Sequence, residues 1–548
     1  MALDYIDEVV KTVIRQFEES GFPEENKSFE IIETMVVMRD GVHLETIIYL
    51  PENNLKSFPT ILQRTCYPHN DRIYRTYGEN LAKRGFAFVY QYCRGNSKSE
   101  GVWVPNINEK DDGIDTVEWL YSQEFVENIG YWGCSYTALA GWAFADKVTS
   151  MCLEHYGTDR FVSAYEKGSF RQDVLTSWTM ENAGFKIDTD YIESCKFMPQ
   201  INVDEKLWGG RIGWYRDYIS NSNETDAYWN QGFWKELKNK PGEAKIPLYI
   251  ISGWYDHHHG STMKTWERLS DKAKKMSWLE IGGWNHFFMN AMAPDIPLTN
   301  FNNNEMKKML CWFDLTLKKK KTPCQNIKYY IMGKDEWLNF GSMDEIKTKE
   351  KEIYFELLEN GDKKLSESMP EKEYSISYIY NPEYPVETLG GDGLLKSAFE
   401  KGGMRRQPEK DFRSDVISFE SDVFKEEHIV IGKIRVELWV GSDAQSTAFT
   451  AKIMSVNTEN EAYNIRTSIT SIEGKEITKA VIDFWDIAFC FKKGSKIRID
   501  ISSSDFPQFN IHSNHTGNWA LQDKIKVVKQ QIFMGGEYGS KLILPVVN

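Results

Sequence analysis

The sequence predicts an α/β domain that carries an inserted helical cap and is followed by an all-β sandwich domain. Three observations lead to this fold class. Apolar strands alternate with helical patterns on both sides of residues 157–244, which favours a parallel sheet covered by helices on both faces. Residues 157–244 are polar, rich in large aromatic side chains, and without a strong strand pattern. After residue 322, apolar residues recur at every second position, which is typical of a β-sandwich.

The first part of the α/β domain contains a hairpin and several further strand patterns. Residues 31–50 predict two strands around Asp40-Gly41, because Asp-Gly between alternating apolar runs is a strong hairpin signal. PTILQRT predicts a compact strand, and NLAKRGFAFVYQYCRG predicts a helix, a glycine turn and a buried strand. DGIDTVEWLYSQ has helical spacing, and NIGYWGCSYTALAGWAFA predicts a short strand, a sharp turn and a helix of small residues.

Strand patterns return after the aromatic segment. IPLYIISGWYD and SWLEIGGWNH are separated by the helical pattern MKTWERLSDKAKK. Further along, IVIGKIRVELWVGSDA, AFTAKIMSV and GSKIRIDISSSDF alternate apolar and polar residues. We therefore predict an α/β domain in two parts, residues 1–156 and 245–321, with the cap at 157–244 and the β-sandwich at 322–548.

The composition argues against several classes of protein. The net charge of -14 repels nucleic acid, and the four lysines at 318–321 are too short a run to offset it. No stretch reaches the roughly 18 apolar residues that a membrane span needs. The eight cysteines include no C-x-x-C pair, which disfavours a zinc ribbon and suits buried reduced thiols. The first 20 residues are acidic and lack an apolar signal core, so we expect a cytoplasmic protein.

A serine occupies a sharp turn between a predicted strand and a predicted helix, in the segment Gly133-Cys134-Ser135-Tyr136. Such a turn projects the serine away from the sheet and directs backbone N–H groups of the helix start at the same point. Gly133 leaves room for the turn. The common G-x-S-x-G pattern has glycine two positions after the serine, where this chain has Thr137. This motif alone does not separate a nucleophile from a serine in an ordinary turn.

A nucleophilic serine needs a base, because a free hydroxyl is barely ionised near neutral pH. In α/β hydrolases the chain order is serine, then acid, then histidine. Asp256 follows the predicted strand IPLYIISGWY, and His286 follows the predicted strand SWLEIGGWN. The carboxyl ends of parallel strands gather functional groups at one edge of a sheet. Order and position together predict Ser135 as nucleophile, His286 as base and Asp256 as the residue that orients the base.

Three histidines, His257, His258 and His259, follow Asp256 directly. Successive residues do not point at one centre, and no Asp, Glu or Cys ligand pattern accompanies them, so we expect no metal and no other cofactor. One of these histidines as the base is the alternative to His286. A triad needs its base on another loop than its acid, which favours His286.

These motifs resemble the family of cocaine esterase, α-amino-acid ester hydrolases and X-Pro dipeptidyl-peptidases. The resemblance rests on GCSYTA, SGWYDHHHG and GGWNH in order, with CRGNSKSEG upstream and NPEYPVETLGG downstream. It implies an α/β-hydrolase domain, a helical cap and a C-terminal jelly roll. It also implies that Ser135, Asp256 and His286 form the triad, and that the Tyr67 hydroxyl and the Tyr136 backbone N–H form the oxyanion hole. Members of this family often form dimers or larger assemblies, so the resemblance leaves a homo-oligomer open.

The sequence departs from the family pattern at three positions near these residues. Ala138 stands where the family usually has glycine, Cys66 precedes Tyr67 where proline is common, and Gly283 replaces the usual proline before His286. None of these departures removes a functional group.

The first functional hypothesis is a serine hydrolase that acts on a small-molecule ester, an amide or a short peptide. Within it, a carboxylesterase competes with an X-Pro dipeptidyl-peptidase, which would need carboxylates to bind the amine of its substrate. The cap offers four candidates, although solvated surface charges are the simpler interpretation: Glu166, Asp173, Asp217 and Asp226. The second hypothesis is a non-catalytic carbohydrate- or protein-binding module on a hydrolase fold. The complete triad argues against it.

Overall fold

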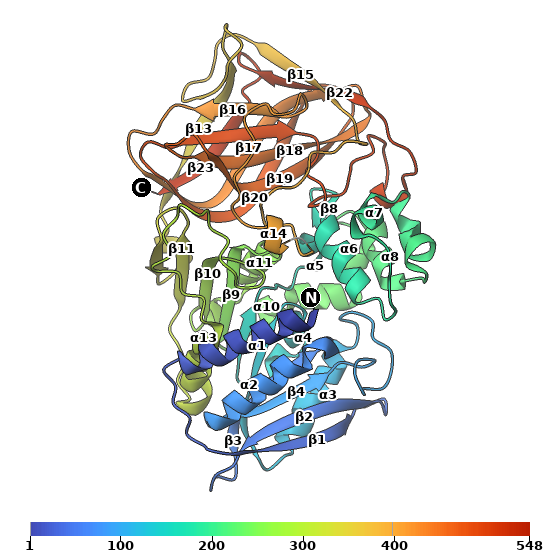
Figure 1. The fold of residues 1–548 in the computed structure, drawn as a ribbon, viewed down its shortest axis with the longest axis vertical. Coiled ribbons are helices and arrows are strands. Elements are labelled where there is room, and N and C mark those ends of the chain that lie inside the picture. Colours follow the sequence, from blue (N-terminus) through green and yellow to red (C-terminus); the bar gives the residue numbers. More distant parts are fainter. Residues whose placement is uncertain (1, 397, 548) are drawn as a thin grey trace.

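The computed structural model describes residues 2–396 and 398–547 and contains two large sheets (Figure 1). The first has ten strands, and its middle strands, from β4 to β11, run parallel. Antiparallel strands flank them on both sides. In spatial order the strands are β1 (Phe29–Val37), β2 (His43–Pro51), β4 (Ala87–Tyr92), β3 (Phe58–Thr65), β5 (Val126–Cys134), β6 (Ser150–Glu154), β9 (Leu248–Tyr255), β10 (Trp278–Asn285), β11 (Asn326–Ile331) and β12 (Glu336–Phe340).

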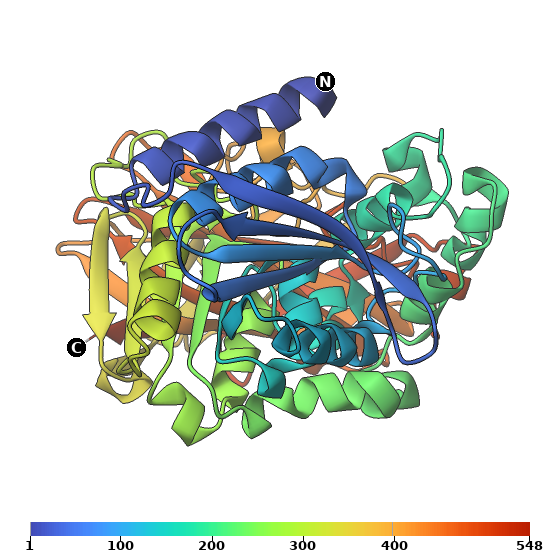
Figure 2. The same cartoon turned by 90° about the horizontal axis from the view of Figure 1, so that it is seen from below.

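Helices cover both faces of this sheet, as the view from below shows (Figure 2). Their bounds are α1 (Ala2–Glu18), α2 (Asp71–Lys83), α3 (Glu109–Tyr121), α4 (Tyr136–Trp142), α11 (His259–Arg268), α12 (Asp271–Lys274) and α13 (Glu305–Phe313). Neighbouring residues of a strand point to opposite faces. Accordingly, buried Ile47 packs with α1 and α13, whereas buried Ile48 packs in the core that continues through the cap into the second sheet. Because both faces of the sheet are covered, the sequences of its strands are continuous apolar runs.

The cap between β6 and β9 is helical apart from the two-residue strands β7 (Tyr165–Glu166) and β8 (Ser169–Phe170). Its helices are α5 (Arg160–Ala164), α6 (Gln172–Glu181), α7 (Tyr191–Lys196), α8 (Gly213–Ser220), α9 (Ala227–Asn230) and α10 (Gly232–Glu243). Many of its aromatic side chains are buried among one another, and Tyr218, for example, stacks on Trp229 with ring centroids 5.9 Å apart. The aromatic richness of this segment is thus largely a packing feature of short helices.

The second sheet is formed almost entirely by antiparallel pairs and lies above the first in Figure 1. Its strands are β13 (Thr348–Leu357), β14 (Lys363–Ser366), β15 (Tyr374–Tyr380), β16 (Ile417–Ser421), β17 (His428–Ser442), β18 (Ser446–Val456), β19 (Ala462–Glu473), β20 (Thr478–Phe491), β21 (Lys496–Ser502), β22 (Val528–Met534) and β23 (Lys541–Val547). The short α14 (Ala398–Lys401) precedes β16. The predicted fold class, an α/β domain with a helical cap followed by an all-β domain, is confirmed.

Two local features differ from the sequence patterns. The helix expected over MKTWERLSDKAKK is two helices, because the chain is extended at Leu269 and Ser270, and the Ser270 hydroxyl accepts the N–H of Ala273 to start α12. The strands β11 and β12 extend the first sheet beyond residue 321. Their alternating pattern resembles that of the later β-domain strands, so the sequence does not reveal which sheet they join.

None of the helices among the described residues combines the length and the apolar character that crossing a membrane requires.

Candidate active site

Ser135 lies in a strained turn between β5 and α4. Its backbone has φ 58° and ψ -128°, a conformation that residues with a side chain rarely adopt. A Cβ atom at Gly133 would lie 2.5 Å from the carbonyl carbon of Thr137, so the turn requires glycine there. The Ser135 N–H donates to the Glu154 carbonyl at 2.9 Å, which ties the turn to β6. Strain held by such contacts is typical of functional sites.

Asp256 and His286 lie at the ends of the adjacent strands β9 and β10 and meet Ser135. The distance from His286 Nε2 to Ser135 Oγ is 3.0 Å, and that from His286 Nδ1 to Asp256 Oδ1 is 2.7 Å. Asp256 also accepts hydrogen bonds from the Ser252 hydroxyl and the His258 backbone N–H. Burial alone would raise the pKa of Asp256, but the surrounding imidazoles, including that of His286, outweigh it and hold this pKa well below its usual value.

Tyr136 directly follows Ser135, and its ring centroid lies 6.4 Å from that of Tyr67. Tyr67 follows β3, its hydroxyl accepts a hydrogen bond from Trp178 Nε1 at 3.1 Å, and burial raises its pKa well above the usual range. The phenol therefore stays neutral and keeps a proton to donate. The Tyr136 hydroxyl instead donates to Glu109 Oε1 at 2.8 Å, which directs this side chain away from the turn. Tyr136 is the first residue of α4, so its backbone N–H has no partner within the helix.

Two further histidines support the His286 ring: His155, which the sequence analysis did not single out, and His257, which it considered only as a metal ligand or an alternative base. The Trp284 indole N–H donates to His155 Nε2 at 3.2 Å, so Nδ1 of His155 carries the proton and donates to the His286 carbonyl at 2.7 Å. The ring of His257 stacks on that of His286 with centroids 3.8 Å apart. Burial lowers the pKa of His155 to about 4 and that of His257 well below its usual value, so both are neutral supports of the His286 ring. The one sequence signal for His155 is its place directly after a strand.

The described residues contain one group whose atoms could in principle hold a metal ion, namely Asp256, His257 and His286, with ligand atoms within 4.8 Å of one another. The hydrogen bond to Asp256 already occupies Nδ1 of His286, and the stacked rings of the two histidines do not present their nitrogens to one common centre. The expectation that the site needs no metal stays a prediction.

Glu154, whose carbonyl holds Ser135, has a buried carboxyl group that is 1% exposed. Burial raises its pKa well above the usual value, and the nearby Glu305 raises it further. The folded protein thus binds this proton more tightly than the unfolded chain, so the associated stability is full at acidic pH and is lost as pH rises towards the folded pKa.

We therefore predict that Glu154→Gln, which keeps the shape but removes the titration, leaves the melting temperature at pH 5 nearly unchanged. At pH 9 the substitution should raise the melting temperature by about 3 °C. Thermal melts at both pH values check this, with Glu118→Gln on the exposed side of α3 as control. Equal shifts at the two pH values would contradict the assignment of a raised pKa.

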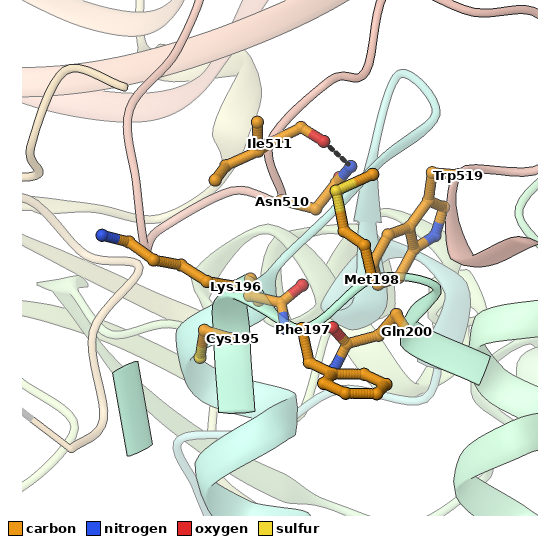
Figure 3. Close-up of a pocket in the computed structure, with 9 residues that line it drawn as sticks. Cys195, Lys196, Phe197, Met198, Gln200, Asn510, Ile511 and Trp519 are labelled. Carbon is orange, nitrogen blue, oxygen red and sulfur yellow. Dashed lines mark hydrogen bonds between the residues drawn. The ribbon is translucent and has the colours of Figure 1, made fainter. Parts of the chain in front are cut away.

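A small hollow lies between the cap and the β domain, away from the triad (Figure 3). Cys195 and Gln200 line it from the cap, and Asn510 and Trp519 from the β domain. The Asn510 amide donates to the Ile511 carbonyl at 3.2 Å. A volume of about 20 Å³ holds roughly one water molecule and no ester substrate.

Known protein families and a known enzyme resemble this chain in sequence. A model of the X-Pro dipeptidyl-peptidase (S15) family matches residues 40–288, and a model of the X-Pro dipeptidyl-peptidase C-terminal non-catalytic domain matches residues 320–543. Cocaine esterase from Rhodococcus sp. (strain MB1 Bresler) is 25% identical over 569 residues, which cover 94% of this chain and 98% of that protein.

Two solved structures share the whole fold. An aminopeptidase from the marine sediment archaeon Thaumarchaeota archaeon superposes with a TM-score of 0.82 at 18% identity, covering 96% of this chain and 99% of its own. An α-amino acid ester hydrolase superposes with a TM-score of 0.77 at 19% identity, covering 96% of this chain and 97% of its own. The predicted resemblance is confirmed. The catalytic-domain model and the C-terminal-domain model match in this order over most of the chain, so the chain is similar along its length to X-Pro dipeptidyl-peptidases (S15) and to cocaine esterase and is a serine hydrolase.

Proposed function

We propose that the protein hydrolyses small carboxylic esters through an acyl-enzyme, with Ser135 as nucleophile, His286 as general base and Asp256 as the residue that orients it. The observation that carries this proposal is the continuous pair of hydrogen bonds from Asp256 through His286 to Ser135 Oγ, at 2.7 and 3.0 Å. The order of the three residues along the chain is that of α/β hydrolases.

The chemistry follows from this arrangement. Ser135 Oγ bonds to the substrate carbonyl carbon while its proton passes to His286 Nε2. The resulting oxyanion accepts hydrogen bonds from the Tyr67 hydroxyl and the Tyr136 backbone N–H. When the bond to the leaving group breaks, His286 returns the proton to the leaving oxygen. A water molecule then repeats the sequence on the acyl-enzyme, and Ser135 is regenerated.

The cap carboxylates favour an esterase over an enzyme that binds a substrate amine. Glu166 pairs with Arg171 and accepts a hydrogen bond from Ser468 of the β domain at 3.1 Å. Asp173 accepts backbone N–H groups of Leu395 and Lys396. These two carboxylates therefore join the cap to the β domain.

The remaining cap candidates do not supply an amine site either. Asp226 accepts the N–H of Asn223 at 2.9 Å within its own turn. Asp217 is an exposed side chain near the positive charge of Arg211. The family match keeps X-Pro dipeptidyl-peptidase activity as the second candidate.

A fluorophosphonate probe and a substrate panel test this proposal. We expect the probe to label Ser135 alone, as identified by peptide mass spectrometry, and denatured protein to remain unlabelled. The panel compares p-nitrophenyl esters, aminoacyl esters and X-Pro anilides. A clear preference for the anilides would replace the esterase assignment with the peptidase, and absence of both labelling and turnover would refute a working triad.

Tyr67→Phe tests the oxyanion hole. The change removes one hydrogen bond made mainly in the transition state, so kcat should fall roughly a hundredfold, or about 3 kcal/mol, with KM little changed. The matched control is Tyr74→Phe, since the Tyr74 hydroxyl hydrogen-bonds to the Thr65 side chain at 2.7 Å and also interacts with the Asn70 side chain, rather than with Ser135. It should keep kcat and lose about 1 kcal/mol of stability. Normal turnover in a destabilised Tyr67→Phe protein would leave the oxyanion hole to backbone N–H groups.

We propose the predicted domain organisation, residues 1–156 and 245–321, 157–244, and 322–548, with one change to its last boundary. The pairing of β11 with β10 supports moving the last boundary beyond Phe340.

The eight free cysteines support the proposed cytoplasmic location, where thiols stay reduced. The homo-oligomer stays a prediction that size-exclusion chromatography with light scattering tests.

A further inference from the structure

Arg160, at the start of α5, is a buried arginine without a carboxylate partner among the described residues. Arg160 is 5% exposed, and its Nε has no hydrogen-bond partner. Aromatic rings surround the guanidinium instead. Its central carbon lies 4.9 Å from the Tyr218 ring centroid, 5.8 Å from that of Tyr156 and 5.9 Å from that of Trp178.

A buried charge without a counter-charge is costly, and buried arginines are normally paired. One Nη atom of Arg160 donates to the Tyr156 hydroxyl, but burial raises the pKa of Tyr156 to about 12, so this partner is neutral at physiological pH. The adjacent Asp159 does not compensate either. Its carboxylate caps α5 through the Val162 N–H and lies 2.7 Å from a guanidinium nitrogen of Arg268. Cation–π contacts offset only part of the cost.

Arg160 is connected to the candidate active site on two sides. Trp178, which contacts the guanidinium, donates its indole N–H to the Tyr67 hydroxyl at 3.1 Å. On the other side, the ring centroids of Tyr156 and His258 are 3.8 Å apart. The ring centroids of His258 and His286 are 5.6 Å apart. One aromatic side chain therefore separates the cation from the oxyanion tyrosine.

We propose that Arg160 is a specificity residue that binds a carboxylate group of the substrate, so that the preferred esters carry a negative charge near the scissile bond. This inference rests on the proposed esterase function and adds the substrate class to it. Guanidinium presents paired N–H donors that match a carboxylate, and such charge-assisted pairs are strongest in water-poor surroundings. The three rings hold the guanidinium in place before the substrate arrives.

Matched neutral and anionic esters test the proposal on the wild-type protein. The acyl arm compares the mono-p-nitrophenyl ester of adipic acid with its methyl ester, which has the same chain but no charge. The leaving-group arm compares 4-acetoxybenzoate with its methyl ester. We expect kcat/KM to be about 10- to 100-fold higher for the anion in one arm, which identifies the side of the scissile bond that carries the carboxylate.

Variants at Arg160 link this preference to the residue. Arg160→Gln should lose the preference while hydrolysing the neutral ester of the same pair within about threefold of wild type, and Arg160→Lys should retain part of it. Melting temperatures identify a variant that fails to fold, and in that case the wild-type comparison alone decides. Neutral esters hydrolysed as well as anionic ones in both arms would overturn the carboxylate site and leave the esterase standing.

A failed esterase proposal would look different. It would give no ester turnover and no fluorophosphonate labelling at Ser135. The carboxylate site is then judged by binding, from the melting-temperature shift with adipate against adipamide, which has the same chain but no charge. A shift specific to adipate in the wild type and absent in Arg160→Gln would support the site, and equal shifts would refute it.

Discussion

Ser135→Ala is expected to lower kcat for ester hydrolysis on the order of 10⁵- to 10⁶-fold, with KM and the melting temperature almost unchanged. The oxygen that would attack the carbonyl is removed, while the donors of the oxyanion hole remain. Alanine adopts the turn conformation about as well as serine does, and the Ser135 N–H still bonds to Glu154. Active-site titration and steady-state kinetics on the same preparation measure the effect.

Cys134→Ser is the matched control, because this thiol precedes Ser135 and is the nearest rival nucleophile. Burial raises the pKa of Cys134 well above its usual value, so little thiolate forms at neutral pH. We expect turnover within about threefold of wild type for this variant. If Ser135→Ala keeps more than a few per cent of wild-type kcat, the nucleophile lies elsewhere.

The candidate site could be predicted from sequence because strand ends in a parallel sheet converge. Ser135, Asp256 and His286 each follow an apolar run that is recognisable by itself, and the parallel register of β5, β6, β9 and β10 brings those ends together. Local chemistry also determines the β1–β2 hairpin, since Asp40-Gly41 suits its tight turn. These features need only short-range patterns and one topological rule.

Features that depend on which side chains meet across the fold could not be predicted in this way. Glu166 and Asp173 read as possible amine-binding groups in the cap, yet their partners Ser468 and Leu395 come from the distant β domain. Arg160 follows an acidic residue in the sequence, yet the Asp159 carboxylate pairs with Arg268 and Lys238, and no carboxylate of the described residues pairs with Arg160. Residue type and spacing carry no information about such choices of partner.

The role of Asp256 leads to the second large effect. Asp256→Asn is expected to lower kcat about 10⁴-fold, because the triad requires the His286 tautomer whose Nδ1–H points at a carboxylate. An asparagine amide at this position can donate to Nδ1 instead, which moves the imidazole proton to Nε2 and prevents it from accepting the Ser135 proton. Ser252→Ala removes another hydrogen bond to Asp256, 2.8 Å long, but keeps the charge. This variant should lower kcat by no more than about tenfold.

Stability provides an independent readout of the same variant. The pKa of Asp256 is below its usual value in the folded protein, so its ionised form stabilises the fold above the unfolded pKa, and this contribution is lost as pH falls through the folded pKa. Asp256→Asn should therefore melt lower than wild type at pH 7, and the difference should shrink towards pH 3. His257→Gln serves as the kinetic control, because His257 is the rival base nearest to Asp256 and stacks on His286 without bonding to Ser135. A loss of 10³-fold or more in His257→Gln, with near-normal turnover in Asp256→Asn, would reassign the base to that histidine.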